Sequence, residues 1–234
     1  MLKPRDDRRH PRADIMLAVS LACCAGATNA IALRAAGVFA ASMTGNVSWM
    51  AEQLEAGAAR PAGFFGAVIA LFIAGSFCCA AATARGLRGK QPGVYAACLF
   101  AEALGIAGCA FIHGPVLLCV ALAFLMGWQN SLATTLTGAR VRATHLSGIC
   151  TDVGIDLSGL WSSRGGAADA GASLRWHRIV LSLATIAAFF VGAFLGCVVF
   201  GRVGGLALVF VAAILSGVAA SGYRTAARFQ GEAP

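Results

Sequence analysis

Long apolar segments follow one another along almost the whole chain, with short polar segments between them. A segment of roughly 20 apolar residues is long enough to cross a bilayer as an α-helix. We identify six such segments: Asp14–Leu33, Pro61–Ala84, Gly93–Ile112, Pro115–Leu136, Ile179–Phe200 and Gly204–Ser221. The pattern predicts an all-α polytopic membrane protein with a single transmembrane domain over residues 14–222. A basic N-terminal tail (1–13) and a C-terminal tail (223–234) then flank this domain.

Two polar motifs interrupt the apolar pattern, and each resembles the other. Glycine and asparagine recur at one offset of 101 residues, as Gly26, Asn29 and Gly37 and again as Gly127, Asn130 and Gly138. The pairs Thr44-Gly45 and Ser147-Gly148 match after a two-residue insertion. This spacing predicts two related halves of three membrane helices each, residues 14–112 and 115–222. Because three is odd, the second half is expected to be inverted, as in many secondary transporters.

Charged residues are few and gather at the ends of the apolar segments. They form 12% of the chain, about half the share found in soluble domains. The net charge of +8 is therefore attributed to loops that face the cytoplasm, and not to a nucleic-acid-binding surface. We expect a bacterial inner-membrane protein with both termini in the cytoplasm, since this orientation places every basic cluster on the inner side.

That orientation requires two further segments, Gly37–Ala56 and Ala143–Leu160, not to cross the bilayer. Both are too polar to face lipid, and irregular backbone at membrane depth is tolerated only inside protein or beside water. We expect each to be a re-entrant or broken polar helix, entering from outside in the first half and from inside in the second. A helix lying on the membrane surface is the alternative.

The same motifs carry a resemblance to a known family. They are Ser42-Met-Thr44-Gly45-Asn46, Gly127-Trp-Gln129-Asn130 and the stretch from Thr144 to Asp152. Over about Asp14 to Ser221 the chain resembles the YoaK-like family of bacterial integral membrane proteins, a domain of unknown function (1275). The family typically has aspartate in place of Asn29 and threonine in place of Ser147. The resemblance implies a membrane location and specifies no substrate.

The motif residues are the candidate substrate-binding site: Asn29, Thr44, Gly45, Asn46, Gln129, Asn130, His145, Ser147 and Gly148. An amide in hydrocarbon needs hydrogen bonds, so Asn29 and Asn130 either bind a solute or brace the breaks in the helices. Thr44-Gly45-Asn46 and Ser147-Gly148 have the composition of a turn followed by a helix cap. A helix that starts inside the membrane presents free N–H groups, which suit an anion or a polar solute. A purely structural kink is the alternative.

Glu102 is an acidic residue far from any expected membrane boundary, and it is the candidate for proton coupling. Arg34 is a possible partner, and without one Glu102 is expected to be protonated because burial penalises the charged form. Four more acids, Glu52, Glu55, Asp152 and Asp156, could form cation-attracting vestibules; the alternative is that they face solvent or pair with basic residues such as Arg140 and Arg142.

Enzymatic chemistry is not expected. His145 and Ser147 are two apart, which suits no helical pair, and the chain has no G-x-S-x-G, H-E-x-x-H, P-loop or G-x-G-x-x-G motif. We therefore expect no catalytic residue, no cofactor and no metal, and the eight of nine cysteines that lie within the apolar segments are interpreted as small hydrophobes.

The function favoured by the sequence is a secondary transporter or permease for a small polar or anionic solute. Its partners are the lipid bilayer, that solute and a second copy if Gly192-x-x-x-Gly196 packs helices between subunits. A non-transporting membrane subunit or scaffold is the alternative. A transporter needs polar residues that water can reach near the membrane midplane, whereas a scaffold needs every such residue paired with protein.

Overall fold

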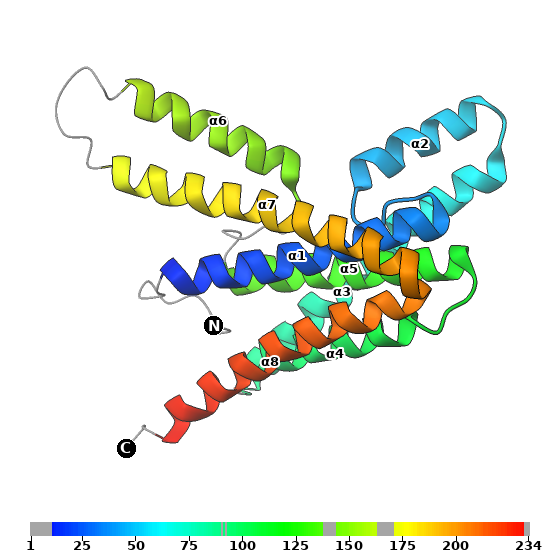
Figure 1. Ribbon diagram of the computed structural model, residues 1–234. Helices are drawn as coiled ribbons and strands as arrows, with labels where there is room; N and C mark the ends of the chain where they lie inside the picture. The colour runs from blue at the N-terminus through cyan, green and yellow to red at the C-terminus, as the bar shows by residue number, and fades with distance from the viewer. Residues whose placement is uncertain (1–10, 90, 92, 138–143, 163–170, 232–234) are drawn as a thin grey trace.

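The structure is a computed structural model that describes residues 11–89, 91, 93–137, 144–162 and 171–231. Helices contain nearly all of these residues (Figure 1). The longer helices are α1 (Pro11–Ala36), α3 (Ala59–Arg88), α5 (Pro115–Thr137), α7 (Ala172–Val203) and α8 (Ala207–Gly231). The shorter ones are α2 (Met43–Glu55), α4 (Val94–Cys109) and α6 (Leu146–Ser162), and a short 3₁₀ helix, η2 (Gly204–Leu206), joins α7 to α8. The predicted all-α class is confirmed.

Four helical stretches in the described residues are long and apolar enough to cross a membrane: Ile15–Ala36, Ala59–Arg88, Pro115–Thr137 and Ala172–Tyr223. The last contains both α7 and α8, which are separated at Gly204, a glycine with a φ of 59°. The expected segment Gly93–Ile112 forms the shorter apolar helix α4, of 16 residues. Apolar helices of this kind are those of a multi-pass membrane protein.

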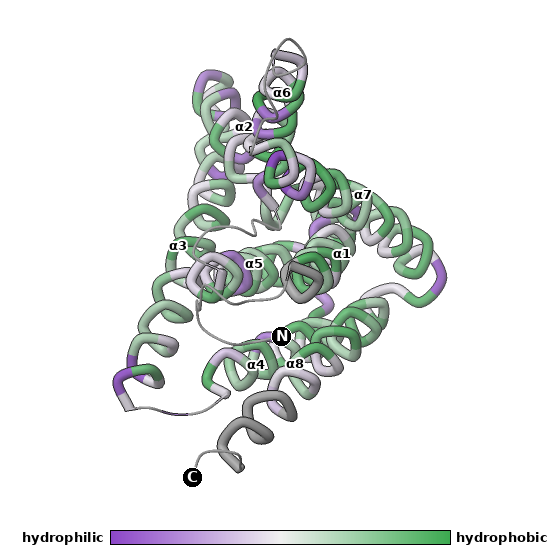
Figure 2. The backbone as a smooth tube through the Cα atoms, turned by 90° about the vertical axis from the view of Figure 1, so that its left-hand side faces the viewer, coloured by the Kyte–Doolittle hydropathy of each residue, from purple (hydrophilic) through white to green (hydrophobic). Residues whose placement is uncertain are grey.

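Each helix of the first half finds its main partner in the second half. α1 packs most extensively on α7, α3 on α5 and α4 on α8, while α1 and α5 also contact each other at the centre (Figure 2). The shorter helices α2 and α6 pack on α3 and α7, the helices that follow them in the chain. If each of α1, α2, α3 and α4 is exchanged for α5, α6, α7 and α8 in turn, the same set of packed helix pairs results. One apolar core joins the halves, and it includes Leu21, Leu99, Leu122 and Leu215.

α1 runs in the opposite direction to α5, and α4 runs in the opposite direction to α8. The end of α1, at Arg34, and the start of α5, at Leu118, line one cavity of about 590 Å³ at the same end of the bundle. The start of α8 meets the end of α4, where a Cβ on Gly205 would lie 2.7 Å from the carbonyl oxygen of Ala110. The first turn of α1 and the last turns of α8 both lie at the other end (Figure 1).

Glycines bring the long helices into backbone contact at two crossings. Where α1 crosses α7, a Cβ on Gly26 would overlap the carbonyl oxygen of Phe189, and one on Gly192 would overlap that of Cys23. Where α3 crosses α5, Gly75 and Gly127 meet the carbonyl oxygens of Phe124 and Phe72 in the same way. Small residues that let helices approach closely are the usual means of packing in membranes, and both crossings use equivalent positions of the two halves.

Candidate functional site

The helices α2 and α6 begin beside each other in the middle of the molecule and run towards opposite ends of it. Figure 1 shows them diverging from a common region, and in Figure 2, a quarter turn away, both lie over the same edge of the bundle. Their first residues, Met43 and Leu146, line the same cavity. The two polar motifs, 101 residues apart in the sequence, therefore meet in the fold.

Hydrogen bonds from the long helices fix the depth at which α2 and α6 begin. The backbone N–H of Ala41 donates to Oδ1 of Asn29 (2.9 Å), and the hydroxyl of Thr144 donates to Oδ1 of Asn130 (2.7 Å). Each asparagine lies seven residues before the end of its helix, which is about 10 Å back along the axis. Both bonds agree with the interpretation of the asparagines as braces for the breaks, although Asn130 accepts from a side-chain hydroxyl and only Asn29 accepts from a backbone N–H.

The side-chain amides of Asn29 and Asn130 differ in their remaining contacts. Nδ2 of Asn130 donates to the carbonyl oxygen of Met126 (2.8 Å), so both ends of this amide are used within the protein. Nδ2 of Asn29 makes no hydrogen bond with any described residue, although the side chain is only 8% exposed. Asn29 lines the cavity that Met43 and Leu146 also line, which we call the central cavity, and Asn130 does not.

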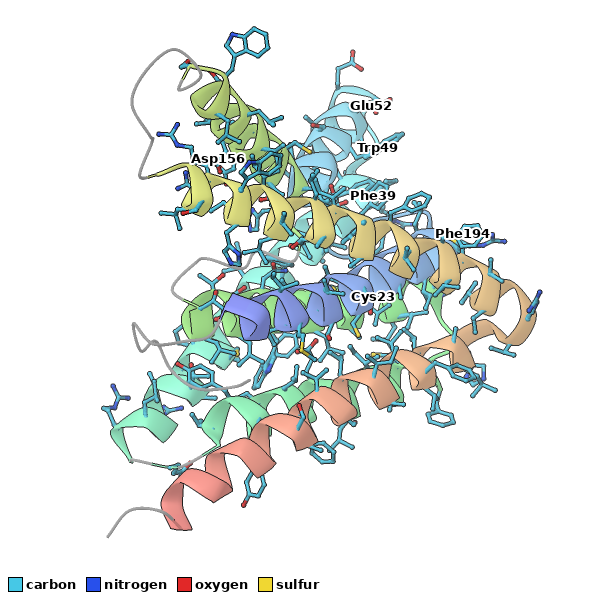
Figure 3. The ribbon with its side chains drawn as sticks, turned by 60° about the vertical axis from the view of Figure 1, so that its left-hand side comes forward. Cys23, Phe39, Trp49, Glu52, Asp156 and Phe194 are labelled. Carbon is cyan, nitrogen blue, oxygen red and sulfur yellow. The ribbon has the colours of Figure 1, made fainter. Side chains whose placement is uncertain are left out.

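The central cavity has a volume of about 560 Å³ and is bounded by both motifs. Its polar lining comes from Asn29, Ser42, Thr44, Thr144, His145 and Ser147, together with Gly45. Its apolar lining includes Phe39 at the base of α2 (Figure 3), with Phe72 from α3 and Phe189 from α7. The structure thus brings together five of the predicted substrate-binding residues: Asn29, Thr44, Gly45, His145 and Ser147.

For α2, the prediction that the glycine makes the bend and that a hydroxyl or amide caps the following helix is wrong. α2 begins after Ser42, which makes no side-chain capping bond, so Thr44, Gly45 and Asn46 lie in its first turns. Gly45 does not have a positive φ, whereas Gly37 does (71°), and the chain turns there. Gly148 lies likewise in the first turn of α6. The breaks come earlier than the motif suggests because the residues before each helix are held by Asn29 and Asn130.

Two further predicted residues, Asn46 and Gln129, are buried and, like Asn130, do not line the cavity. Asn46 is 1% exposed, and its Nδ2 donates to the carbonyl oxygen of Phe39 (2.8 Å), which ties α2 to the preceding loop. Gln129 is fully buried, and neither atom of its amide has a hydrogen-bond partner among the described residues. Thr28, which is the equivalent of Gln129 in the first half, has a buried hydroxyl that lacks one in the same way.

Glu102 is buried in α4, and neither carboxylate oxygen has a hydrogen-bond partner in the part of the chain that the structure describes. The suggested pairing with Arg34 is wrong, since that residue lies at the end of α1 and lines the 590 Å³ cavity instead. Glu102 does not line the central cavity. It is therefore a buried polar group separate from the site.

Of the four acids near the helix ends, Asp156 is buried and points from α6 towards α7 (Figure 3). It accepts a hydrogen bond from Arg178 of α7 and forms an ion pair with it. The partners suggested by the sequence, Arg140 and Arg142, lie outside the described residues. Glu52, Glu55 and Asp152 are exposed, and Glu52 points away from the bundle (Figure 3).

The described positions of His145, Ser147, the cysteines and the acidic residues bear on hydrolase, disulfide and metal chemistry. No hydrogen bond joins His145 to Ser147 there, so the nucleophile and base of a hydrolase are not assembled by this pair. All nine cysteines are free thiols. No group of three His, Cys, Asp or Glu side chains among the described residues could hold a metal ion.

The aromatic walls of the cavity were not predicted from the sequence. Phe72 and Phe189 precede Gly75 and Gly192 by three residues, so the pattern F-x-x-G occurs in both halves at one offset of 117 residues. A comparison of the later helices of each repeat would have revealed this signal. Within each pattern, the glycine makes the helix crossing and the phenylalanine faces the cavity beside it.

Comparison with known proteins identifies the family but not the activity. A family model described as "Protein of unknown function (DUF1275)" matches residues 17–221, and the chain belongs to this family. No curated protein matches the chain. No solved structure matches it either.

Proposed function

We propose that this member of the DUF1275 family is a secondary transporter for a small polar or anionic solute, with the central cavity as its binding site. The observation that carries the proposal is the cavity itself, which has both polar and apolar walls, is built from both repeated motifs and is large enough for a small organic molecule. Binding between the repeated halves, at the starts of broken helices, is the arrangement that inverted-repeat transporters use.

In this proposal α1, α3, α4, α5, α7 and α8 cross the bacterial inner membrane as two inverted halves. The opposed directions of α1 and α5, and of α4 and α8, support this, as does the set of pairings that survives exchange of the halves. α4 is about 24 Å long, less than the roughly 30 Å hydrocarbon core, and its packing on α8 compensates for this. The N-terminal end of α1 and the C-terminal end of α8 then both face the cytoplasm.

The helices α2 and α6 are then half-helices that begin near the midplane and run to opposite faces. A solute between their starts then lies about 10 Å along the helix axis from the C-terminal end of α1 and from the C-terminal end of α5. Small movements of one half against the other would open the cavity to one side of the membrane at a time. This supplies the alternating access that a secondary transporter requires.

A non-transporting scaffold is the competing proposal, and it draws support from the bracing bonds of Asn29 and Asn130. It does not account for the polar cavity, or for the buried polar atoms of Gln129 and Glu102 that lack partners among the described residues. A structural bundle has no reason to retain such groups, because each costs free energy when left unpaired.

Cysteine labelling tests the proposal without knowledge of the solute. Thr44→Cys and Ser147→Cys are placed in a background whose nine native cysteines are replaced by alanine, and are treated with a water-soluble maleimide. Both should react from water, more slowly than the exposed control Glu55→Cys. If neither reacts while the control does, the cavity is dry and the scaffold proposal gains.

We propose Glu102 as the group that couples transport to protons. It is a buried carboxyl with no partner among the described residues, and such groups within membranes generally serve proton or ion movement. Once a solute is known, Glu102→Gln should abolish the dependence of vesicle uptake on a pH gradient. Gln129→Leu, which removes another unpartnered group but no proton, is the control. Unchanged gradient dependence in Glu102→Gln would exclude this role.

A further inference from the structure

The first turns of α2 and α6 border the central cavity, and their first backbone N–H groups have no acceptor within the helices. The first helical bonds are those from Asn46 N–H to Ser42 and from Ile149 N–H to His145, so the residues between have no acceptor within their helices. Three of these residues in α2, Met43, Thr44 and Gly45, and two in α6, Leu146 and Ser147, line the cavity. Both helix starts also carry partial positive charge, which favours an anion between them.

Asn29 adds a side-chain donor that is independent of the helix starts. Its Oδ1 accepts from Ala41 N–H, which fixes the orientation of the amide and leaves Nδ2 as the free end. The side chain is 92% buried, lines the cavity and has no partner for Nδ2 among the described residues. Because this donor has no acceptor among the described residues, a ligand that supplies an oxygen here would gain a hydrogen bond.

The rest of the lining restricts the charge and the shape of the ligand. None of the described residues that line the cavity is Asp or Glu, so nothing among them neutralises a cation, and His145 is the one described lining residue that can carry a positive charge. Phe39, Phe72 and Phe189 provide apolar walls, and the volume of about 560 Å³ exceeds the needs of a simple inorganic ion. These features suit one negative charge on a short hydrocarbon body.

We propose that the cavity binds a small organic monocarboxylate, with its carboxylate between the starts of α2 and α6 and accepting a hydrogen bond from Nδ2 of Asn29. This inference rests on the proposed transport function and specifies its substrate class. The two phenylalanines contributed by α3 and α7 enclose the hydrocarbon body. The equivalent asparagine, Asn130, holds Thr144 in place and takes no part in binding.

The test compares isosteric probes on the purified full-length protein by thermal unfolding in detergent. Butyrate should raise the unfolding temperature and bind at least about 10-fold more tightly than butyramide, while butylammonium should not bind. Stabilisation by butyramide or butylammonium equal to that by butyrate would overturn the selection for a carboxylate. Equal stabilisation by nitrate would show that the site recognises charge alone, which would overturn the organic class.

Variants separate the site from general effects of charge. Asn29→Asp keeps the acceptor for Ala41 N–H, removes the donor and adds a negative charge, so butyrate affinity should fall at least about 10-fold with little change in the unliganded unfolding temperature. Gln53→Glu adds the same charge at the far end of α2 and should leave butyrate binding unchanged. Unaltered binding in Asn29→Asp would overturn the role of Asn29.

The two proposals fail in different ways. No response to butyrate, together with maleimide labelling of positions 44 and 147, would remove the carboxylate and leave the transporter. Absence of labelling at both positions would remove the transporter itself. Uptake of butyrate into vesicles that contain the protein, and its loss in Asn29→Asp, would support both.

Discussion

Asn29 and Asn130 occupy equivalent positions in the two halves, but the protein uses their side chains differently. Asn130 satisfies both ends of its amide within the protein, whereas Nδ2 of Asn29 has no acceptor among the described residues and lies at the cavity. The acceptor role that positions the following helix is common to both. The halves therefore share a structural task, and only the first has a donor left for a ligand.

The helix crossings show the opposite behaviour, because the two halves have kept them alike. Gly26 and Gly192 form one crossing, and Gly127 and Gly75 form the other, and at each of them a Cβ would overlap a backbone oxygen of the partner helix. Close backbone contact leaves no space for variation, whereas a polar loop beside a cavity can change its chemistry. The two halves are thus alike at the helix crossings and differ at the cavity.

The largest effect is expected at the crossings. Gly75→Val and Gly192→Val place side-chain atoms where the partner helix has backbone oxygens, and overpacking of this kind costs about 3 kcal/mol or more because backbone cannot yield. Both variants should be lost as monodisperse protein in size-exclusion chromatography. Gly63→Val on α3 and Gly201→Val on α7, where nothing lies within 4 Å, are the matched controls. Equal yields of variants and controls would mean that the crossings are not close.

A smaller difference should separate the two asparagines. Asn130→Ala breaks bonds to Thr144 and Met126, and Asn29→Ala breaks only the bond to Ala41. Since each buried hydrogen bond contributes about 1 kcal/mol, Asn130→Ala should lower the free energy of unfolding by about 1 kcal/mol more than Asn29→Ala does. Thermal unfolding in detergent measures this. A reversed order would show that Nδ2 of Asn29 has a partner in the unliganded protein.

Polar groups with and without partners should respond in opposite directions. Ser76→Ala removes the bond from the Ser76 hydroxyl to the carbonyl oxygen of Gly127 (2.9 Å) and should cost about 1 kcal/mol. Gln129→Leu removes an amide that has no partner among the described residues, and it should leave the unfolding temperature unchanged or raise it. A clear loss of stability in Gln129→Leu would indicate that a bound water or ion satisfies that amide.

The smallest effect is expected for the ion pair between α6 and α7. The side chain of Arg178 is 55% exposed, so its attraction to Asp156 is screened, and pairs of this kind contribute about 1 kcal/mol or less. A double-mutant cycle with Asp156→Asn and Arg178→Met should give a coupling energy below that value. The first half has Gln53 at the place of Asp156, so this pair is not part of the shared structure. A coupling above about 2 kcal/mol would contradict this assessment.

The amino-acid sequence was sufficient for the features that depend on composition and repetition. Apolar length identified the long helices, and the offset of 101 residues identified the motifs that meet at the cavity. It was insufficient where tertiary contacts decide the outcome. The helix breaks lie at residues 37–42 and not at Gly45, because Asn29 holds Ala41 from a distance of twelve positions. The partner of Asp156 is Arg178, since α6 folds back on α7.

The phenylalanine walls illustrate the same limit. Phe72 and Phe189 lie in uniformly apolar stretches, in which no periodicity distinguishes a side chain facing lipid from one facing a cavity. Only the crossing of α3 with α5, and of α1 with α7, gives these positions their direction.

The exchange of partners between the halves has a consequence for assembly. The only covalent connection between residues 1–112 and 113–234 is the turn before α5. The helices α1, α3 and α4 nevertheless each have their main contacts in the other fragment. Either fragment produced alone would expose its crossing glycines to lipid and be degraded. Co-expressed as two separate chains, they should recombine into the intact protein.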